Sequence, residues 1–232
     1  MSIANAIHAS TVETYIESHL STPDPAITHA RETTHQHNIP SISLSPGQGR
    51  FLKMLASCTK AQNILELGTL GGHSTIWLSR AIKERGGKVT SIDINPLHRD
   101  VATENLRFAG VKVPEDVEIL LGAGLDILPS LEKDIQSGVR EPFDFVFIDA
   151  DWPNQWRYFD YGVRLARGTG SVLFVDNAVA ALLDYGVVGP EERDEGFVSL
   201  VEEVGRDERV EAVVVQTVGA RSYDGFLMAV VN

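Results

Sequence analysis

The chain has 232 residues, enough for one large α/β domain with a full hydrophobic core, and we expect residues 1–232 to form that single domain. A net charge of −12 without any cluster of Lys or Arg argues against nucleic acid or an anionic membrane as a partner. One cysteine excludes an internal disulfide, and neither a signal peptide nor a long apolar run is evident, so we expect a soluble cytoplasmic protein.

The N-terminal part is predicted to be helical. Apolar residues on one side predict an amphipathic helix from about Ser10 to Leu20. A proline-containing break at 22–25 is followed by a polar helix that extends to about Asn38. A third helix over Gln48–Cys58 leads into the first strand.

The stretch NILELGTLGGHS, residues 63–74, predicts the first unit of a nucleotide-binding α/β fold. An apolar strand contains Glu66 near its end, a glycine-rich loop follows, and a helix with an apolar face comes next. Such glycines let the backbone approach a ligand, and the N-terminus of the helix points unpaired N–H groups at it. A second strand over Lys88–Ile94 contains Asp93, where these folds place a carboxylate on a ribose hydroxyl.

The spacing of the glycines discriminates between nucleotides. A dinucleotide site requires G-x-G-x-x-G, whereas this loop reads G-T-L-G-G-H-S after Glu66, whose carboxylate would repel a pyrophosphate. A P-loop is excluded because no G-K-[ST] follows the glycines. The motif E-L-G-T-x-G-G-x-S instead resembles the first motif of S-adenosylmethionine-dependent methyltransferases. A dehydrogenase is the less favoured alternative.

The rest of the chain alternates predicted helices and strands. These are a helix over Pro96–Ala109, a strand over Val117–Leu121, a helix over Ile127–Ser137, a strand over Phe143–Ile148, a helix over Asn154–Ala166, a strand over Ser171–Val175, a long connection over Ala178–Glu195, a helix over Phe197–Val204 and strands over Val210–Thr217 and Gly225–Val231. Alternation followed by a strand pair predicts an α/β fold, with a mostly parallel sheet and helices on both faces.

Acidic and amide side chains collect where predicted strands end, at the sheet edge where ligands bind. Asp149 and Asp151 follow one strand, and Asp176 and Asn177 follow another. A buried carboxylate is costly without a positive partner, and ligands that offer only oxygen favour Mg²⁺, with Ca²⁺ or Mn²⁺ also suitable. The alternative is that Asp149 and Asp176 only cap the helices that follow them. The pattern alone leaves both interpretations open.

From about Ile42 to Asn232 the chain resembles the cation-dependent O-methyltransferase family, which includes catechol and caffeoyl-coenzyme A O-methyltransferases. The resemblance is carried by LELGTLGGHS (65–74), SIDINP (91–96), FDFVFIDAD (143–151), VLFVDN (172–177) and QTVGARSYDGF (216–226). It implies a Rossmann-like class I methyltransferase fold, with N-terminal helices over about 1–58 before the core. The expected sheet is seven-stranded and mostly parallel, with an antiparallel C-terminal strand.

The same resemblance implies a set of residues for each ligand. S-adenosylmethionine would contact Glu66, Gly68, Gly72, His73, Ser74, Asp93, Gly122, Ala123, Gly124, Asp149 and Asp151. A divalent cation would be held by Asp149, Asp176 and Asn177. The cation would bind a small catechol-like or polyphenolic acceptor, lower the pKa of a hydroxyl and aim its oxygen at the sulfonium methyl. Relatives commonly dimerise through their N-terminal helices, so a homodimer is expected.

Position 152 departs from the family. Relatives usually carry a lysine there as the base for the hydroxyl, whereas this chain has Trp152, and an indole cannot accept that proton. We expect the cation held by Asp149 to acidify the hydroxyl sufficiently, since general-base help is typically about 10²–10⁴-fold. One alternative is that another group acts as the base. The other is an S-adenosylmethionine-binding protein of the same fold with lost or altered chemistry, either metal-independent or non-methylating.

Aromatic residues near that position are candidates for acceptor contact, namely Trp152, Trp156 and Tyr185. Trp156 with Phe159 also fits the core face of a helix at i, i+3 spacing. The long connection over Ala178–Glu195 suggests an acceptor-binding loop. No basic residue directly follows the Asp-Asn pair, which argues against an anionic coenzyme A tail.

Overall fold

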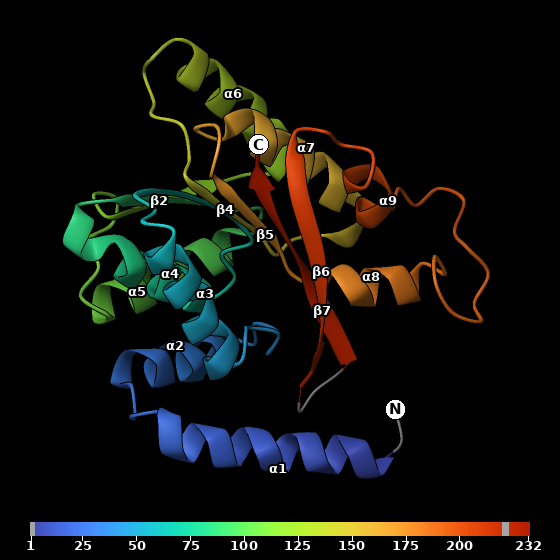
Figure 1. Ribbon diagram of the computed structural model, residues 1–232. Coiled ribbons are helices and arrows are strands. Elements are labelled where there is room, and N and C mark those ends of the chain that lie inside the picture. The colour runs from blue at the N-terminus through green and yellow to red at the C-terminus, as the bar shows by residue number, and fades with distance from the viewer. Residues whose placement is uncertain (1–2, 220–222) are drawn as a thin grey trace.

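The computed structural model describes residues 3–219 and 223–232 and shows one twisted sheet between layers of helices (Figure 1). Residues 220–222 of the predicted tail motif fall outside that part. The strands are β1 (Asn63–Leu67), β2 (Lys88–Asp93), β3 (Val117–Leu121), β4 (Phe145–Ile148), β5 (Val172–Val175), β6 (Val210–Val218) and β7 (Tyr223–Val231). Their spatial order is β3-β2-β1-β4-β5-β7-β6. Strand β7 pairs antiparallel with both β5 and β6, and the other paired strands are parallel, which confirms the predicted sheet.

The centre of the sheet creates the ligand-binding crevice. From β1 the chain builds outward through β2 to β3, and then returns to β4 on the other side of β1. Connections therefore leave the adjacent carboxyl ends of β1 and β4 in opposite directions. An open crevice forms at such a point in a parallel sheet, and ligands bind there.

Helices cover both faces of the sheet. They are α1 (Ile3–Leu20), α2 (Pro25–Gln36), α3 (Pro46–Cys58), α4 (His73–Ile82), α5 (Pro96–Phe108), α6 (Gly124–Gln136), α7 (Gln155–Leu165), α8 (Ala178–Asp184) and α9 (Leu200–Val204), with short 3₁₀ turns η1 (Lys83–Arg85) and η2 (Trp152–Asn154). No helix in the described ranges is long and apolar enough to cross a lipid bilayer.

Two hydrophobic clusters fix the layers. On one face, α2, α3, α4 and α5 pack on β-strand residues that include Ile64 and Phe147. On the other face, α6, α7 and α9 pack on Leu65, Val146 and their neighbours. Alternate residues of β1 and β4 thus enter opposite clusters, which is the period-2 pattern of a central strand. Helix α1 lies at the periphery, beside α2 (Figure 1).

Several predicted boundaries need correction. The connection over Ala178–Glu195 is not irregular throughout, because its AVAALLD segment forms helix α8. Helix α9 is shorter than predicted and begins at Leu200, after the Ser199 cap. Helix α1 extends back to Ile3, and α6 begins at Gly124 rather than Ile127. These ends depend on tertiary packing, which local sequence signals do not encode.

Candidate active site

A cavity of about 550 Å³ opens at the carboxyl ends of β1, β2 and β4. Most of its lining comes from the loops that follow these strands. The lining residues are Ile42, Ser43, Leu44, Leu67, Gly68, Thr69, Leu70, His73, Ser74, Ile92, Asp93, Ile94, His98, Gly122, Ala123, Gly124, Leu125, Asp149, Ala150, Asp151, Asn154 and Tyr158. Most residues expected to contact S-adenosylmethionine are therefore brought to one cavity. The exceptions are Glu66 and Gly72, which lie behind its wall.

Gly68 allows β1 and β4 to meet at the floor of the cavity. Its φ of +97° lies in the left-handed region, and a Cβ atom there would overlap the carbonyl oxygen of Asp149. The Gly68 N–H donates to Ile92 O at 2.9 Å, and the Asp149 N–H donates to Leu67 O at 2.9 Å. The loop therefore turns away from the sheet without any side chain separating the ligand from the backbone. Gly72 instead packs against Ala102 of α5.

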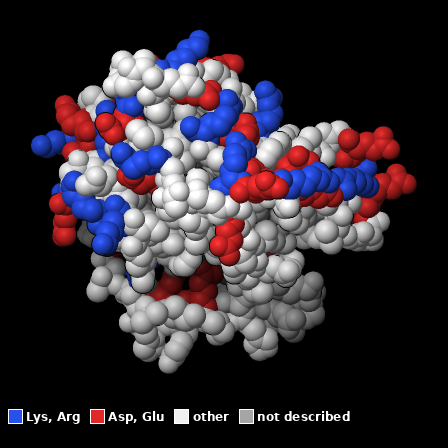
Figure 2. All heavy atoms as spheres, turned by 45° about the horizontal axis from the view of Figure 1, so that its top comes forward, with Lys and Arg blue, Asp and Glu red and all other residues white. Residues whose placement is uncertain are grey.

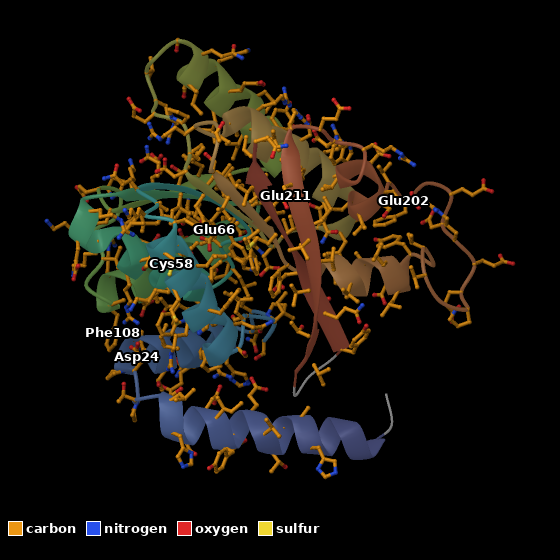
Figure 3. The ribbon with its side chains drawn as sticks, in the orientation of Figure 1. Asp24, Cys58, Glu66, Phe108, Glu202 and Glu211 are labelled. Carbon is orange, nitrogen blue, oxygen red and sulfur yellow. The ribbon has the colours of Figure 1, made fainter. Side chains whose placement is uncertain are left out.

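Glu66 lies inside the molecule, beneath the glycine loop (Figure 3). Its Oε2 accepts hydrogen bonds from Thr75 Oγ1 at 2.5 Å and Ser91 Oγ at 2.6 Å. Its buried Oε1 accepts none from the described residues. Burial raises the pKa of Glu66 to about 7, against the opposing effect of its hydroxyl donors. The site therefore presents a carboxyl whose ionisation a nearby cationic ligand group would favour.

Asp93 lines the cavity and is fixed by several donors. Its Oδ2 accepts from Leu70 N at 2.8 Å and its Oδ1 accepts from Asn95 N at 2.8 Å. Nδ1 of His98 lies 3.2 Å from Oδ1 and completes the set. The sequence analysis overlooked His98, although its position in the first turn of α5, just after Asp93, is the available signal. Because Leu70 N and Asn95 N both donate to Asp93, these bonds fix the glycine-rich loop and the Asp93 carboxylate relative to each other.

Asp151 is held at the opposite rim. Tyr158 donates its hydroxyl to Asp151 Oδ1 at 2.5 Å, and Asn154 Nδ2 donates to Oδ2 at 2.5 Å. Burial and the adjacent Asp151 raise the pKa of Tyr158, so its hydroxyl stays protonated. The Tyr158 ring also lies against Gly124, where a Cβ would come within 2.9 Å of it. Tyr158 thus joins the D-A-D segment to the bend after β3.

The candidate cation ligands lie at the ends of two hydrogen-bonded strands, since Ile148 of β4 pairs with Val175 of β5. Burial and the charges of Asp176, Glu66 and Asp224 raise the pKa of Asp149 well above its ordinary value. Burial also raises the pKa of Asp176, with a further contribution from Asp224. The charges that act on these carboxyls are acidic, and such a group favours a positive partner.

The third predicted ligand, Asn177, has a left-handed backbone with φ of +58°. Its side-chain nitrogen donates to Asp224 Oδ2 at 2.8 Å, which leaves the amide oxygen free to accept. Within 3–219 and 223–232, no group of three or more His, Cys, Asp or Glu side chains is arranged to hold an ion. A cation site here therefore requires the Asn177 oxygen in addition to Asp149 and Asp176, and these oxygen donors suit a hard cation.

The capping alternative assigned Asp149 and Asp176 to helix caps, but neither residue occupies the N-cap position of the helix that follows it. Asn177 is the N-cap residue of α8 but makes no side-chain capping bond. The Ala180 N–H instead donates to Asp224 Oδ1 at 2.8 Å. Asp151, the N-cap residue of η2, likewise makes no side-chain capping bond. Asp224, at the start of β7, was overlooked as a separate site residue, and its only sequence signal was the tail motif.

The residues predicted to contact the acceptor, Trp152, Trp156 and Tyr185, do not line the cavity. Trp156 stacks on Phe159 with ring centroids 6.0 Å apart and packs against the core, as its helical spacing had allowed. Tyr185 stacks on Phe197 with centroids 4.0 Å apart. Trp152 is partly buried at the start of η2. Packing against neighbouring elements therefore accounts for Trp156 and Tyr185 without an acceptor.

Comparisons with known proteins show which family this chain resembles. An O-methyltransferase family model matches residues 17–229. A catechol O-methyltransferase from Niastella koreensis is 38% identical over 223 residues, covering 95% of this chain and 96% of the relative. An O-methyltransferase from Bacillus cereus, solved in complex with SAH, has a TM-score of 0.87 at 36% identity, covering 98% of this chain and 100% of that one. TomG from Streptomyces achromogenes, an O-methyltransferase solved with SAM and involved in tomaymycin synthesis, has a TM-score of 0.85 at 34% identity, with 100% of both chains covered.

Proposed function

The chain belongs to the family of S-adenosylmethionine-dependent O-methyltransferases, and we propose that it methylates a hydroxyl of a small catechol-like or polyphenolic acceptor with the help of a divalent cation. The observation that carries the cation assignment is the buried Asp176 carboxylate and the half-buried Asp149 carboxylate, both with raised pKa values, beside the amide oxygen of Asn177. Mg²⁺ is the preferred ion, with Ca²⁺ or Mn²⁺ as substitutes.

The cavity floor suits the charges of S-adenosylmethionine. Glu66 lies behind the cavity wall with its Oε1 lacking a hydrogen-bond donor among the described residues, so its ionised carboxylate would attract a cationic ligand group electrostatically and not by direct contact. Asp93 faces the cavity with its carboxylate fixed by Leu70 and Asn95, which suits a ribose hydroxyl. Gly122–Gly124 border the space left for the adenine, and Tyr158 holds the Asp151 carboxylate on the same side. Each group is positioned before the ligand arrives, which favours catalysis by orientation.

When bound, the cation supplies a positive charge that acidifies an acceptor hydroxyl. Asp149, Asp176 and Asn177 would hold it at the ends of β4 and β5. Asp149 also lines the cofactor cavity, so the same residue would bring the acceptor oxygen close to the reactive methyl. Trp152 offers no proton acceptor, and this chain therefore relies on acidification more than on a general base.

The acceptor class rests on the relative's name and on chemistry. The Niastella protein is a catechol O-methyltransferase, and vicinal hydroxyls suit a site with carboxylate and amide ligands for one hard cation. The second candidate is an S-adenosylmethionine-binding protein with lost or altered chemistry, which Trp152 favours. The connection after α8 is proposed as an acceptor-binding loop, with Trp152, Trp156 and Tyr185 reaching an acceptor only if that region rearranges.

We also propose that the protein is a cytoplasmic homodimer built from one domain per chain. Helices α2 and α3 contribute Ile27 and Leu52 to the same cluster as β1 and β4, which favours a single folding unit. Exposed apolar side chains on α1 provide a surface for a second copy. The exposed free thiol of Cys58 fits a reducing compartment.

The reaction is tested with methyl-labelled S-adenosylmethionine and a panel of catechols, flavonoids and other polyphenols, in Mg²⁺ or in EDTA. The proposal predicts labelled methyl ether only with Mg²⁺, and loss of that product in Asp149→Ala and Asp176→Ala variants. Transfer that persists in EDTA would remove the cation from the mechanism. Cofactor binding without transfer to any acceptor would favour the second candidate.

A further inference from the structure

Asp224 connects the cation-site end of β5 to the start of β7. Its Oδ2 accepts from Asn177 Nδ2 at 2.8 Å, although the two residues are 47 positions apart. Its Oδ1 accepts from Ala180 N at 2.8 Å and from Gly225 N at 2.7 Å. Both oxygens are therefore committed to named donors. The Asp224 carboxylate closes a bridge between the Asp-Asn turn, the first turn of α8 and β7.

The chemistry of this bridge decides how the Asn177 amide is turned. A carboxylate only accepts, so the side chain of Asn177 must present its NH₂ group to Asp224. The amide oxygen then points away from Asp224. Because Asn177 makes no capping bond to α8, its oxygen is not used by the helix. Rotation of the amide would place oxygen against oxygen at Asp224 and an N–H group where a cation ligand is needed.

Close packing keeps Asp224 in place. A Cβ at Gly225 would lie 2.6 Å from Val179 Cγ2 of α8 and would also overlap the Val215 carbonyl of β6. The start of β7 therefore approaches α8 as closely as backbone allows.

We propose that Asp224 is a positioning residue that fixes the Asn177 amide with its oxygen toward the cation site shared with Asp149 and Asp176. The inference rests on the cation of the proposed function. It assigns Asp224 no contact with substrate or cofactor. Partners that orient metal ligands in this way typically change metal affinity about 10–100-fold when they are removed.

The test is a double-mutant cycle on the full-length protein, read as Mn²⁺ affinity by electron paramagnetic resonance. The variants are Asp224→Asn, Asn177→Asp and the double variant. In Asp224→Asn, the new amide still caps Ala180 through its oxygen but turns its NH₂ toward the NH₂ of Asn177. We expect Mn²⁺ binding to weaken about 10–100-fold, while the affinity for S-adenosylhomocysteine in EDTA changes less than about twofold.

The same substitution should have the opposite sign in the Asn177→Asp background. In Asn177→Asp alone, the carboxylate at position 177 faces the carboxylate of Asp224. In the double variant, the amide at position 224 donates to the carboxylate at position 177. Mn²⁺ should therefore bind more tightly to the double variant than to Asn177→Asp alone. A role limited to charge predicts weaker binding in both backgrounds, because one negative charge is lost each time. A role limited to capping predicts no change in either. Only the sign reversal supports the orienting role.

Controls separate the possible failures. Asp184→Asn, an exposed change of the same kind at the end of α8, should leave Mn²⁺ affinity unaltered. If the wild-type protein fails to bind Mn²⁺, the cation of the proposed function is wrong and the role of Asp224 falls with it. If the wild type binds Mn²⁺ and Asp224→Asn binds it equally well, the proposed function stands and the inference about Asp224 is overturned.

Discussion

Glu66 is a buried acid whose ionisation costs stability until a ligand compensates it. Its pKa in the folded protein is about 7, against an ordinary value of 4.5. Between these values the folded state keeps a proton that the unfolded state has lost, so stability falls as pH rises through this window. Above it, the unfavourable contribution reaches about 3 kcal/mol, at roughly 1.4 kcal/mol for each pKa unit.

A Glu66→Gln variant should remove this pH dependence. Urea unfolding at pH 5 and at pH 8, without cofactor, should show the variant gaining stability relative to wild type as pH rises. Asp176 titrates in both proteins, and the difference between them contains the titration of Glu66 together with its electrostatic effect on Asp149. Parallel pH profiles of the two proteins would show that Glu66 is already ionised in the folded state at pH 5.

Trp152 stands where the family's base lysine would be, and it is partly buried at the start of η2. A Trp152→Lys variant should raise kcat for a catechol acceptor at pH 7 by about tenfold or more, toward the lower end of general-base effects. The measurement is initial rate at saturating S-adenosylmethionine. Trp152→Gln removes the ring without supplying a base, so an equal gain there would attribute the effect to lost bulk.

At the scale of elements, the sequence predicted what local chemistry determines. The start of α5 at Pro96 was predicted, and Asn95 caps it as such a residue does. Helices α2 and α3 begin at Pro25 and Pro46, slightly before their predicted starts, because Asp24 and Ser45 cap them. Strands β1 to β5 were recognised because buried parallel strands read as short apolar runs. Helix α8 was missed because its seven residues follow the Asp-Asn turn, where the cap comes from Asp224 and not from the local sequence.

In the candidate site too, some residues could be predicted from the sequence, whereas their hydrogen-bond partners could not. Glu66, Asp93, Asp149 and Asp176 could be proposed from sequence because each lies at or next to the end of a strand. The bonds of Thr75 and Ser91 to Glu66, and of Tyr158 to Asp151, depend on how helices and strands meet. Such contacts join residues that no local pattern pairs. Polar partners of functional side chains were therefore the part that needed a structure.

The contact between the loop after β1 and the end of β4 makes Gly68 a sensitive position. Gly68→Ala should cost several kcal/mol, because a Cβ would overlap the Asp149 carbonyl and φ is +97°. We expect S-adenosylhomocysteine affinity, measured by calorimetry, to fall at least about tenfold. Gly138→Ala is the matched control, since its φ is +73° but nothing lies within 4 Å. It should cost only about 1–2 kcal/mol of backbone strain and leave affinity intact.

At the scale of the whole molecule, the charged surface contains residues of both signs. Figure 2 shows Lys and Arg interspersed with Asp and Glu on the face it presents. Many exposed charges pair locally, for example Arg99 with Asp100 and Arg167 with Glu141. Exposed pairs of this kind contribute little to stability. The net charge of −12 therefore bears on solubility and association more than on the fold.

Apolar side chains on α1 bear on assembly. Val12, Tyr15, Ile16 and Leu20 are between 47% and 73% exposed, and their spacing places them along one side of the helix. Arg50 of α3 donates to Leu20 O at 2.5 Å, which ties the C-terminal end of α1 to the body. A helix with an apolar face open to water is suited to contact with a second copy, where burial of that face would stabilise a dimer.

The combined variant Tyr15→Asp and Leu20→Asp should therefore shift the protein from dimer to monomer. Two buried charges with no partner would cost more than such an interface gains from this face. Sedimentation velocity over a range of concentrations measures the change, and circular dichroism checks that the monomer keeps its fold. The paired control, Ser10→Asp and Thr14→Asp, adds the same charge on the opposite side of α1 and should remain dimeric. A wild-type protein that sediments as a monomer at every concentration would rule the dimer out and leave the α1 face exposed for another reason.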